Sequence, residues 1–159
     1  MALAGLENTT GTKIYVALGE PATYTAAALA TLGGFEQVIG VVTFGEWGDQ
    51  ETDVSEPLLA EGRVIHTTGT ADGGTVAISI QTRDTDAGSD IIKAAGGTNE
   101  AVTIMKVYAS GDGEVATGVF MSARFRDASG NSVRGYSTSA MLNTGVTELS
   151  AADVTTALA

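Results

Sequence analysis

Short runs in which β-branched or aromatic residues alternate with polar ones recur along the chain and predict β-strands. Asp72-Gly73-Gly74 separates two such runs, and an Asp-Gly pair between β-rich runs predicts a hairpin. The first predicted strand ends at the turn residues of Gly19-Glu20-Pro21. The predicted strands are 12–18, 35–44, 62–71, 75–82, 101–109, 114–125 and 132–142.

Two segments instead have helical character. Residues 25–32 are rich in alanine, with Thr25 as a candidate N-cap and Gly33-Gly34 at the end. Residues 84–95 carry acids in the first turns and Lys93 near the end, as the helix dipole favours. The second segment is the clearest helix of the chain.

Strands at hairpin spacing with few helices predict an α+β, mainly β fold. We expect two packed antiparallel sheets, as a sandwich or barrel, flanked by one α-helix, with a long loop and terminal arms. No internal repeat or linker divides the chain, so 13–145 is predicted to be a single domain. Residues 1–12 are predicted as an N-terminal arm. Residues 146–159 are predicted as a C-terminal arm anchored by Leu149, Val154 and Leu158.

The segment from Glu46 to Glu61 interrupts the strand pattern. It is polar and acidic, carries almost no turn residues, and is too long for an ordinary hairpin connection. Loops of this length without secondary structure are usually functional or disordered. The composition of this loop predicts a contact surface rather than a reaction site.

Composition and charge narrow the possible functions. The 159 residues suffice for one core, and the absence of cysteine excludes disulfides and thiolate metal sites. The first residues lack the pattern of a signal peptide, and no apolar run reaches the ~18 residues of a membrane span. Nineteen acidic residues against eight basic ones give a net charge of −11. This balance argues against tight binding to nucleic acid or to an anionic membrane.

No catalytic or metal-binding pattern stands out. His66 is the single histidine, so a Ser-His-Asp relay would need it, but its place within a strand favours a structural role. Asp84, Asp86 and Asp90 resemble part of a calcium loop, yet the glycine and the final glutamate that such a loop needs are missing, and helix capping explains these acids better. Trp47 could stack a sugar, and an interface role is favoured. We expect no enzyme activity, no cofactor and no bound metal.

The order of these features resembles the tail tube proteins of long-tailed bacteriophages and of gene transfer agents. The resemblance rests on the Phe44-Gly-Glu-Trp-Gly48 turn, the acidic loop, the glycine-rich strand before Asp72-Gly73-Gly74, the helix after Thr82 and two long strands. It covers residues 13–142. The same fold family includes the tubes of contractile tails and of type VI secretion.

The resemblance implies a structural subunit that forms hexameric rings, which stack into a hollow tube. It implies that the tube conducts DNA without specific binding, that it belongs to the virion tail, and that it assembles in the host cytoplasm. The implied partners are further copies of the chain, the tape measure protein, the tail terminator and tail-tip proteins, with no membrane insertion.

The resemblance also assigns surfaces. It implies that the loop at 46–61 and the two terminal arms make the contacts between rings. The expected contact residues are Trp47, Asp49, Glu51, Asp53, Glu56, Leu58, Leu59, Leu149 and Val154. The expected residues of the channel wall are Asp72, Ser79, Gln81 and Glu114.

Physical reasoning adds two expectations and leaves two alternatives. Carboxylates along a channel would repel phosphates, so we expect a net negative channel wall. We expect Trp47, Leu58 and Leu59 to anchor the ring contact while the loop's carboxylates keep free subunits soluble. The alternatives are a β-sandwich ligand-binding module, which should show a cleft with converging aromatic residues, and a small hydrolase built around His66.

Overall fold

The computed structural model describes residues 9–60, 62–126 and 128–159. One antiparallel sheet of nine strands, a separate two-stranded sheet and three helices make up the described chain. The strands are β1 (Lys13–Leu18), β2 (Glu36–Val38), β3 (Val41–Phe44), β4 (Gln50–Leu58), β5 (Arg63–Asp72), β6 (Thr75–Gln81), β7 (Ala101–Val107), β8 (Gly113–Phe120), β9 (Arg124–Phe125), β10 (Gly135–Leu142) and β11 (Thr147–Leu149). The helices are α1 (Ala26–Leu32), α2 (Ala87–Ala95) and α3 (Ala151–Ala157).

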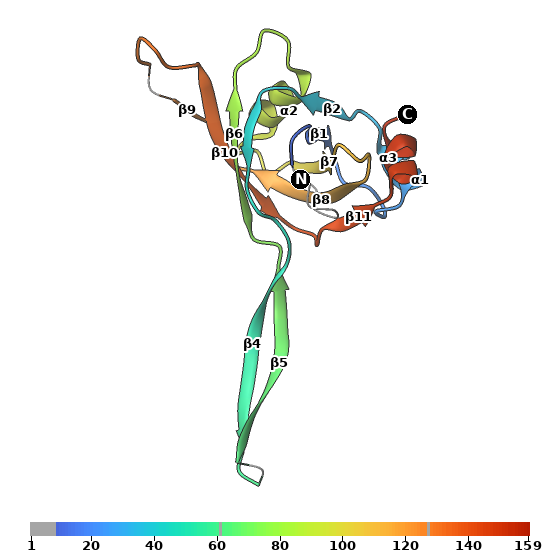
Figure 1. The fold of residues 1–159 in the computed structure, drawn as a ribbon, viewed down its shortest axis with the longest axis vertical. Helices are drawn as coiled ribbons and strands as arrows, with labels where there is room; N and C mark the ends of the chain where they lie inside the picture. Colours follow the sequence, from blue (N-terminus) through green and yellow to red (C-terminus); the bar gives the residue numbers. More distant parts are fainter. Residues whose placement is uncertain (1–8, 61, 127) are drawn as a thin grey trace, which may run out of the picture.

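The large sheet curls around a hydrophobic core. Its strand order is β2-β1-β7-β8-β10-β6-β3, with β11 added beside β8 and β9 beside β10. In Figure 1, β6 and β10 run along the long axis, and β1, β7 and β8 lie to their right. Val16 and Ile104 from one half and Ile80 and Tyr136 from the other belong to the same buried cluster. The predicted mainly β, α+β class is confirmed, with the two packed layers formed by the halves of one continuous sheet that is not a closed barrel.

Both predicted helices are present, and each begins at or near the residue where the sequence predicts its start. Thr25 caps α1, and Asp86 caps α2 by accepting a hydrogen bond from the Ser89 amide at 3.0 Å. The other carboxylate oxygen of Asp86 accepts from the amides of Ile39 and Gly40 at 3.1 and 3.2 Å. Asp86 therefore holds the start of α2 against the segment at Ile39 and Gly40. Among the described residues there is no group of three or more potential metal ligands.

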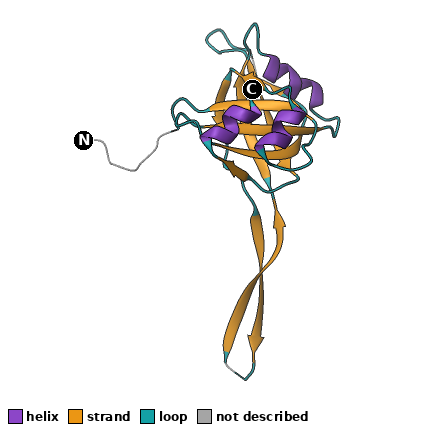
Figure 2. Cartoon of the chain, turned by 90° about the vertical axis from the view of Figure 1, so that its right-hand side faces the viewer, coloured by secondary structure: helices purple, strands orange, loops and turns teal. Residues whose placement is uncertain are grey.

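The C-terminal segment is part of the folded body, which corrects the expectation of a projecting arm. β11 pairs with β8, and α3 begins with a capping box between Ser150 and Asp153. The helix packs beside α1 (Figures 1 and 2). Leu149 and Val154 are buried with Leu29 in a second hydrophobic cluster. Burial of these two side chains holds the segment to its own subunit.

The predicted acidic loop is wrong in its secondary structure, because Gln50–Leu58 forms β4 and pairs along its length with β5. The predicted hairpin at Asp72-Gly73-Gly74 is also wrong, since β5 pairs with β4 and β6 pairs with β3 and β10. There the Gly74 amide donates to the Asp72 carboxylate at 3.0 Å, and the chain passes from β5 into β6. The chain thus forms one long hairpin, with β3 and β4 on one side and β5 and β6 on the other.

The remaining expectations concern the chain's ends and membranes. Of the predicted N-terminal arm, residues 1–8 lie outside the described residues. Residues 9–12 form a turn closed by a hydrogen bond from the Thr12 amide to the Thr9 carbonyl. In the part of the chain that the structure describes, no helix has the length and apolar character needed to cross a bilayer.

Candidate functional site

The most distinctive feature is the arm, which we define as β4, β5 and the turn that joins them. It projects away from the body in both views (Figures 1 and 2). Nine strand residues in β4 correspond to a length of roughly 30 Å at about 3.3 Å per residue. Every residue of β4 is exposed, and so is every residue of β5 except the half-buried Gly69. An isolated two-stranded ribbon is marginally stable in water, so the arm lacks the packing that strands normally require.

The strand register gives the arm two different faces. Opposed residues of an antiparallel pair point to the same side, and successive residues alternate. Val54 opposes Thr67, Glu56 opposes Ile65 and Leu58 opposes Arg63, so these six residues share one face. The apolar side chains on that face, Val54, Leu58 and Ile65, are 48%, 40% and 49% exposed. This stripe of apolar side chains flanked by charges is suited to contact with another protein surface.

The opposite face of the arm holds the single histidine. The Asp53 carboxylate lies 2.9 Å from His66 Nδ1, and Ser55 opposes His66 in the register. The three residue types of a hydrolytic triad therefore share one face. However, His66 and Asp53 are more than half exposed, and the structure describes no hydrogen bond between Ser55 and His66. A site of this kind needs a positioned nucleophile and an oxyanion site shielded from water, and this open ribbon supplies neither.

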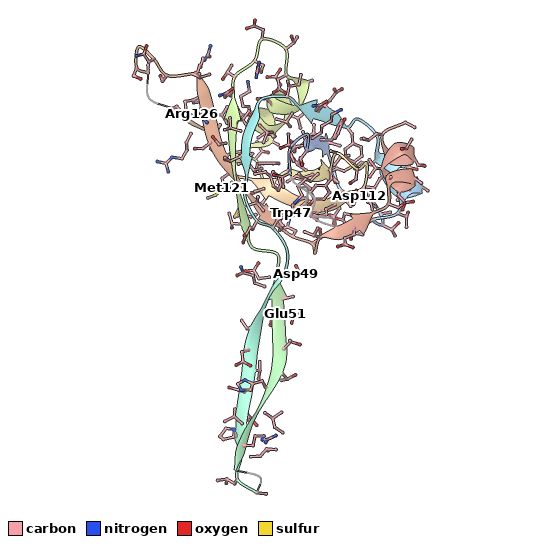
Figure 3. All side chains as sticks on the ribbon, viewed as in Figure 1. Trp47, Asp49, Glu51, Asp112, Met121 and Arg126 are labelled. Atoms are coloured by element: carbon pink, nitrogen blue, oxygen red, sulfur yellow. The ribbon has the colours of Figure 1, made fainter. Side chains whose placement is uncertain are left out.

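A compact group of side chains fixes the arm to the body. This root cluster consists of Phe44 and Trp47, which precede the arm, and Lys106, Tyr108 and Glu114 on or beside β7 and β8. Trp47 Nε1 donates to the Glu114 carboxylate at 2.7 Å, and the Tyr108 hydroxyl donates to it at 2.8 Å. The Trp47 ring packs edge-on against Phe44 with centroids 5.0 Å apart. Figure 3 labels Trp47 at the junction of body and arm, with Asp49 and Glu51 following along the chain.

A largely buried ion pair completes the root cluster. Lys106 and Glu114 are directly opposed on β7 and β8, and their charged groups are 2.9 Å apart. The two side chains are only 16% and 22% exposed. The Lys106 ammonium also lies 5.2 Å from the Trp47 ring centroid. Each charged group of such a pair holds the other in place, because either group without its partner would be an unpaired charge removed from water.

The protonation behaviour of the root cluster follows from these contacts. Burial alone would raise the pKa of Glu114, but the hydrogen bonds from Lys106, Trp47 and Tyr108 outweigh it and lower this pKa. Burial alone would lower the pKa of Lys106, and its contacts with Tyr108 and Glu114 raise it instead. Both shifts favour the charged forms, so the ion pair persists over a wide range of pH.

A second surface lies on the outer side of the sheet half formed by β3, β6 and β10. We call it the polar face. Thr43, Ser79 and Ser137 are directly paired across the three strands and therefore share this side, as Ala77 and Ser139 do. Together with Met121 and Arg124 they line a shallow hollow of about 550 Å³. Its lining is small and hydroxyl-rich, and its one charged member is an arginine.

The structure brings only part of the predicted channel-wall set together. Ser79 lies on the polar face, and Gln81 follows it two residues later on the same strand. Asp72 lies instead at the end of β5, where its carboxylate binds the Gly74 amide. Glu114 is ion-paired within the root cluster. Neither acid therefore supplies a free carboxylate to the face that carries Ser79.

The predicted contact residues fall into three groups. Glu51, Asp53, Glu56 and Leu58 lie on the arm, and Leu59 lies fully exposed at its turn. Trp47 lies in the root cluster, with Asp49 beside it at the start of the arm. Leu149 and Val154 are buried in the second hydrophobic cluster of the same subunit.

Reasoning from the sequence missed three functional candidates. It did not assign β5 to the arm, although Val64 and Ile65 are unusually apolar for a surface segment. It did not pair Lys106 with Glu114, although a Gly-Asp-Gly turn lies between them. It also gave no role to Arg124 and Arg126, which emerge on the polar face, where Arg126 donates to the Ser79 hydroxyl.

Comparison with known proteins gives a consistent fold. No protein-family model matches the chain, and no curated protein sequence matches it. A solved structure of the SPP1 tail tube superposes with a TM-score of 0.65 at 15% identity, covering 87% of this chain and 76% of that one. A sheath/tube terminator of an extracellular contractile injection system, PVC, gives 0.61 at 8% identity, covering 93% and 100%. A subunit from the tail of an empty GTA particle gives 0.55 at 16% identity, covering 91% and 100%.

These identities are low, so the likeness carries the fold and leaves the roles of individual residues open. The SPP1 and GTA structures are both tails, and the third is a component that ends a tube. The resemblance that we drew from the order of elements in the sequence is confirmed at this level. The chain has the fold of phage tail tube proteins.

Proposed function

We propose that this protein is the major tail tube subunit of a phage-type tail. In this role it forms rings, which we expect to be hexameric, and the rings stack into a conduit through which DNA leaves the virion. The observation that carries the proposal is the combination of a tail tube fold with a fully exposed arm. A tube subunit acts by assembly, so no catalytic role is included.

The arm supports a role in joining rings. Head-to-tail contacts are the ones that continue along an axis, and an element that projects from one end of the subunit can make them. The arm meets this need, because its apolar stripe of Val54, Leu58 and Ile65 is uncovered in the free chain. Trp47 and Asp49 then act at the root, where the ion-paired cluster sets the direction of the arm.

The polar face supports a role as the channel wall. It belongs to the sheet half from which the arm continues, and its serine, threonine and alanine side chains offer no strong binding groups for a passing polymer. We retain Ser79 and Gln81 as wall residues. A net negative wall remains a prediction, and any carboxylates that supply it come from outside the lining of this hollow.

Self-assembly gives the direct test. We would concentrate the purified full-length chain and examine it by negative-stain electron microscopy. The expected result is rings or tubes, and strictly monomeric protein under all conditions would count against the proposal. The partners we propose beyond the chain itself are a tape measure protein, a tail terminator and tail-tip proteins. Their binding can be assayed on the tubes once these form.

Removing the arm tests its role. Gln50 and Asp72 are direct partners in the register, so residues 51–71 can be replaced by an Asn-Gly turn that closes the strands there. We expect a folded subunit with the thermal unfolding temperature of the original chain that no longer forms tubes. Normal polymerisation of this variant would show that the arm does not join rings.

The likeness to an injection-system terminator raises a second candidate function. A terminator caps a tube and does not extend it, and the terminator structure covers the chain as fully as the tail structures do. The two functions differ in the length of the product. Tubes of many rings would indicate a tube subunit, whereas assembly that stops at single rings would indicate a terminator.

A further inference from the structure

The two ends of the molecule carry opposite charge. Residues 50–72 contain five acidic residues and a single arginine, whereas residues 124–134 contain three arginines and a single aspartate. The second segment projects from the body at the end away from the arm (Figure 1). Figure 3 labels Arg126 there and Glu51 at the start of the arm. In a protein of net charge −11, this basic projection is unusual.

We call the basic projection the arginine edge and define it as Arg124, Phe125, Arg126 and Arg134. β9 pairs only with β10 within the described chain, so one side of β9 is free. The backbone amide of Arg126 donates to the Gly135 carbonyl at 3.1 Å, which holds the edge against β10. Within the described residues, none of the three arginines is in an ion pair. Apart from the contact of Arg126 with the Ser79 hydroxyl, the described residues supply no partner for these charges.

The arginine edge also offers apolar contact. Phe125 is 67% exposed although its ring lies near Tyr136, with centroids 6.1 Å apart. Because successive strand residues alternate in direction, Phe125 lies on the opposite side of β9 from Arg124 and Arg126. Arginine and aromatic side chains are enriched in protein interfaces. A segment that binds along this edge would therefore meet arginines on one side and an apolar ring on the other, which fits a partner that carries both carboxylates and aliphatic side chains.

The arm has this composition. Glu56 shares the apolar stripe with Val54, Leu58 and Ile65, and Glu51 lies nearer the root. Glu51 and Glu56 have no ion-pair partner among the described residues, whereas Asp53 is paired with His66. Because arm and edge lie at opposite ends of one subunit, each can meet the other only on a second copy.

We infer that the arginine edge is the receiving surface for the arm of the subunit in the next ring. This inference rests on the proposed function and names the partner surface of the arm. Arg124 is the residue we expect to pair with Glu51 or Glu56 of that neighbour. The contact is heterologous, as stacking along an axis requires. Complementary charge at such a surface mainly accelerates association and fixes the register.

Charge reversal tests the inference. Arg124→Glu is compared with Lys13→Glu, because Lys13 is an exposed cation on β1, outside the edge. Tube growth is followed by light scattering and electron microscopy, and circular dichroism verifies the fold of each variant. We expect Arg124→Glu to slow tube growth by about tenfold or more and Lys13→Glu to change it by less than about twofold.

Rescue by a second reversal identifies the partner. Glu51→Arg and Glu56→Arg are made singly and in combination with Arg124→Glu in the same chain. At least one combination should restore growth to within about threefold of the original rate, because a reversed pair keeps its attraction. Normal growth of Arg124→Glu, or failure of both combinations to restore growth, would overturn the inference.

The arm-deleted variant separates this inference from the proposed function. If that variant polymerises, the proposed role of the arm fails. If it does not polymerise while Arg124→Glu does, only the arginine edge is misassigned. Retention of double-stranded DNA by tubes is measured in parallel. Loss of DNA retention in Arg124→Glu with normal growth would show that the edge contacts a nucleic acid, which overturns the inference.

Discussion

The body and the arm are built from the same kind of antiparallel strand pair and differ in what covers them. In the body, β7 and β8 pair over seven residues, and nearly all of their side chains are buried. In the arm, β4 and β5 pair over a similar length with both faces exposed. Burial supplies most of the free energy that stabilises a sheet. The body therefore buries its strands within one subunit, whereas the arm leaves both of its faces uncovered.

The largest effect should come from a body side chain. Phe120 is 2% exposed in the main core, and replacing it with alanine leaves a cavity that costs about 3–5 kcal/mol of unfolding free energy. Urea unfolding followed by circular dichroism measures this loss. Val54→Ala on the arm serves as the comparison and should change the same quantity by less than about 0.5 kcal/mol. Equal losses would contradict the division into body and arm.

A smaller effect is expected at the junction of the two regions. Lys106→Met leaves Glu114 as a largely buried charge without its cation, which should cost about 2–3 kcal/mol because both groups keep some contact with water. The double variant Lys106→Met/Glu114→Gln removes the charge as well and should recover most of the loss. A double-mutant cycle by urea unfolding gives the coupling free energy between the two side chains. A coupling near zero would show that the pair does not hold the junction.

The pH dependence of stability should identify the same pair. The pKa of Glu114 in the folded protein lies below its ordinary value of 4.5. A lowered folded pKa adds stability above the unfolded pKa, and this stability is lost as the pH falls through the folded pKa. Unfolding free energy should therefore decline less steeply below about pH 4.5 in Glu114→Gln than in the original chain. Identical pH profiles would exclude a contribution from Glu114.

The smallest effect on the subunit should come from the apolar stripe of the arm. Ile65 is about as exposed as Ile39 in the body, so Ile65→Ser and Ile39→Ser form a matched pair. Both should leave the unfolding free energy within about 0.5 kcal/mol of the original, because neither side chain is buried. Only Ile65→Ser should reduce the yield of tubes in sedimentation assays. Equal yields would remove the stripe from the proposed contact.

Much of the body could be predicted from the sequence, because local signals and tertiary packing agree there. α2 follows its capping residue Asp86, and the hairpin of β7 and β8 follows from alternation around a Gly-Asp-Gly turn. α3 carries an equally clear signal, since Ser150 and Asp153 form a capping box, but its segment was read as a tail.

The arm could not be predicted in the same way, because β4 has no buried face to impose alternation on its sequence. Its partner β5 was recognised as a strand and assigned to the wrong neighbour. The Asp-Gly pair after β5 predicted a hairpin between β5 and β6. Instead, β5 pairs with the whole length of β4, through the turn at its other end. The root cluster depends on contacts such as Trp47 with Glu114, 67 residues apart, which no local pattern records.

The continuity of the long hairpin has a mechanical consequence. β6, which continues from the arm, pairs with β10 through seven residues and with β3 on its other side. Hydrogen bonds in such ladders run perpendicular to the strands. A pull along the arm therefore loads many of them in shear at once, instead of peeling them apart singly. In the tail proposed above, tension from bending or stretching would pass directly into the nine-stranded sheet of each subunit.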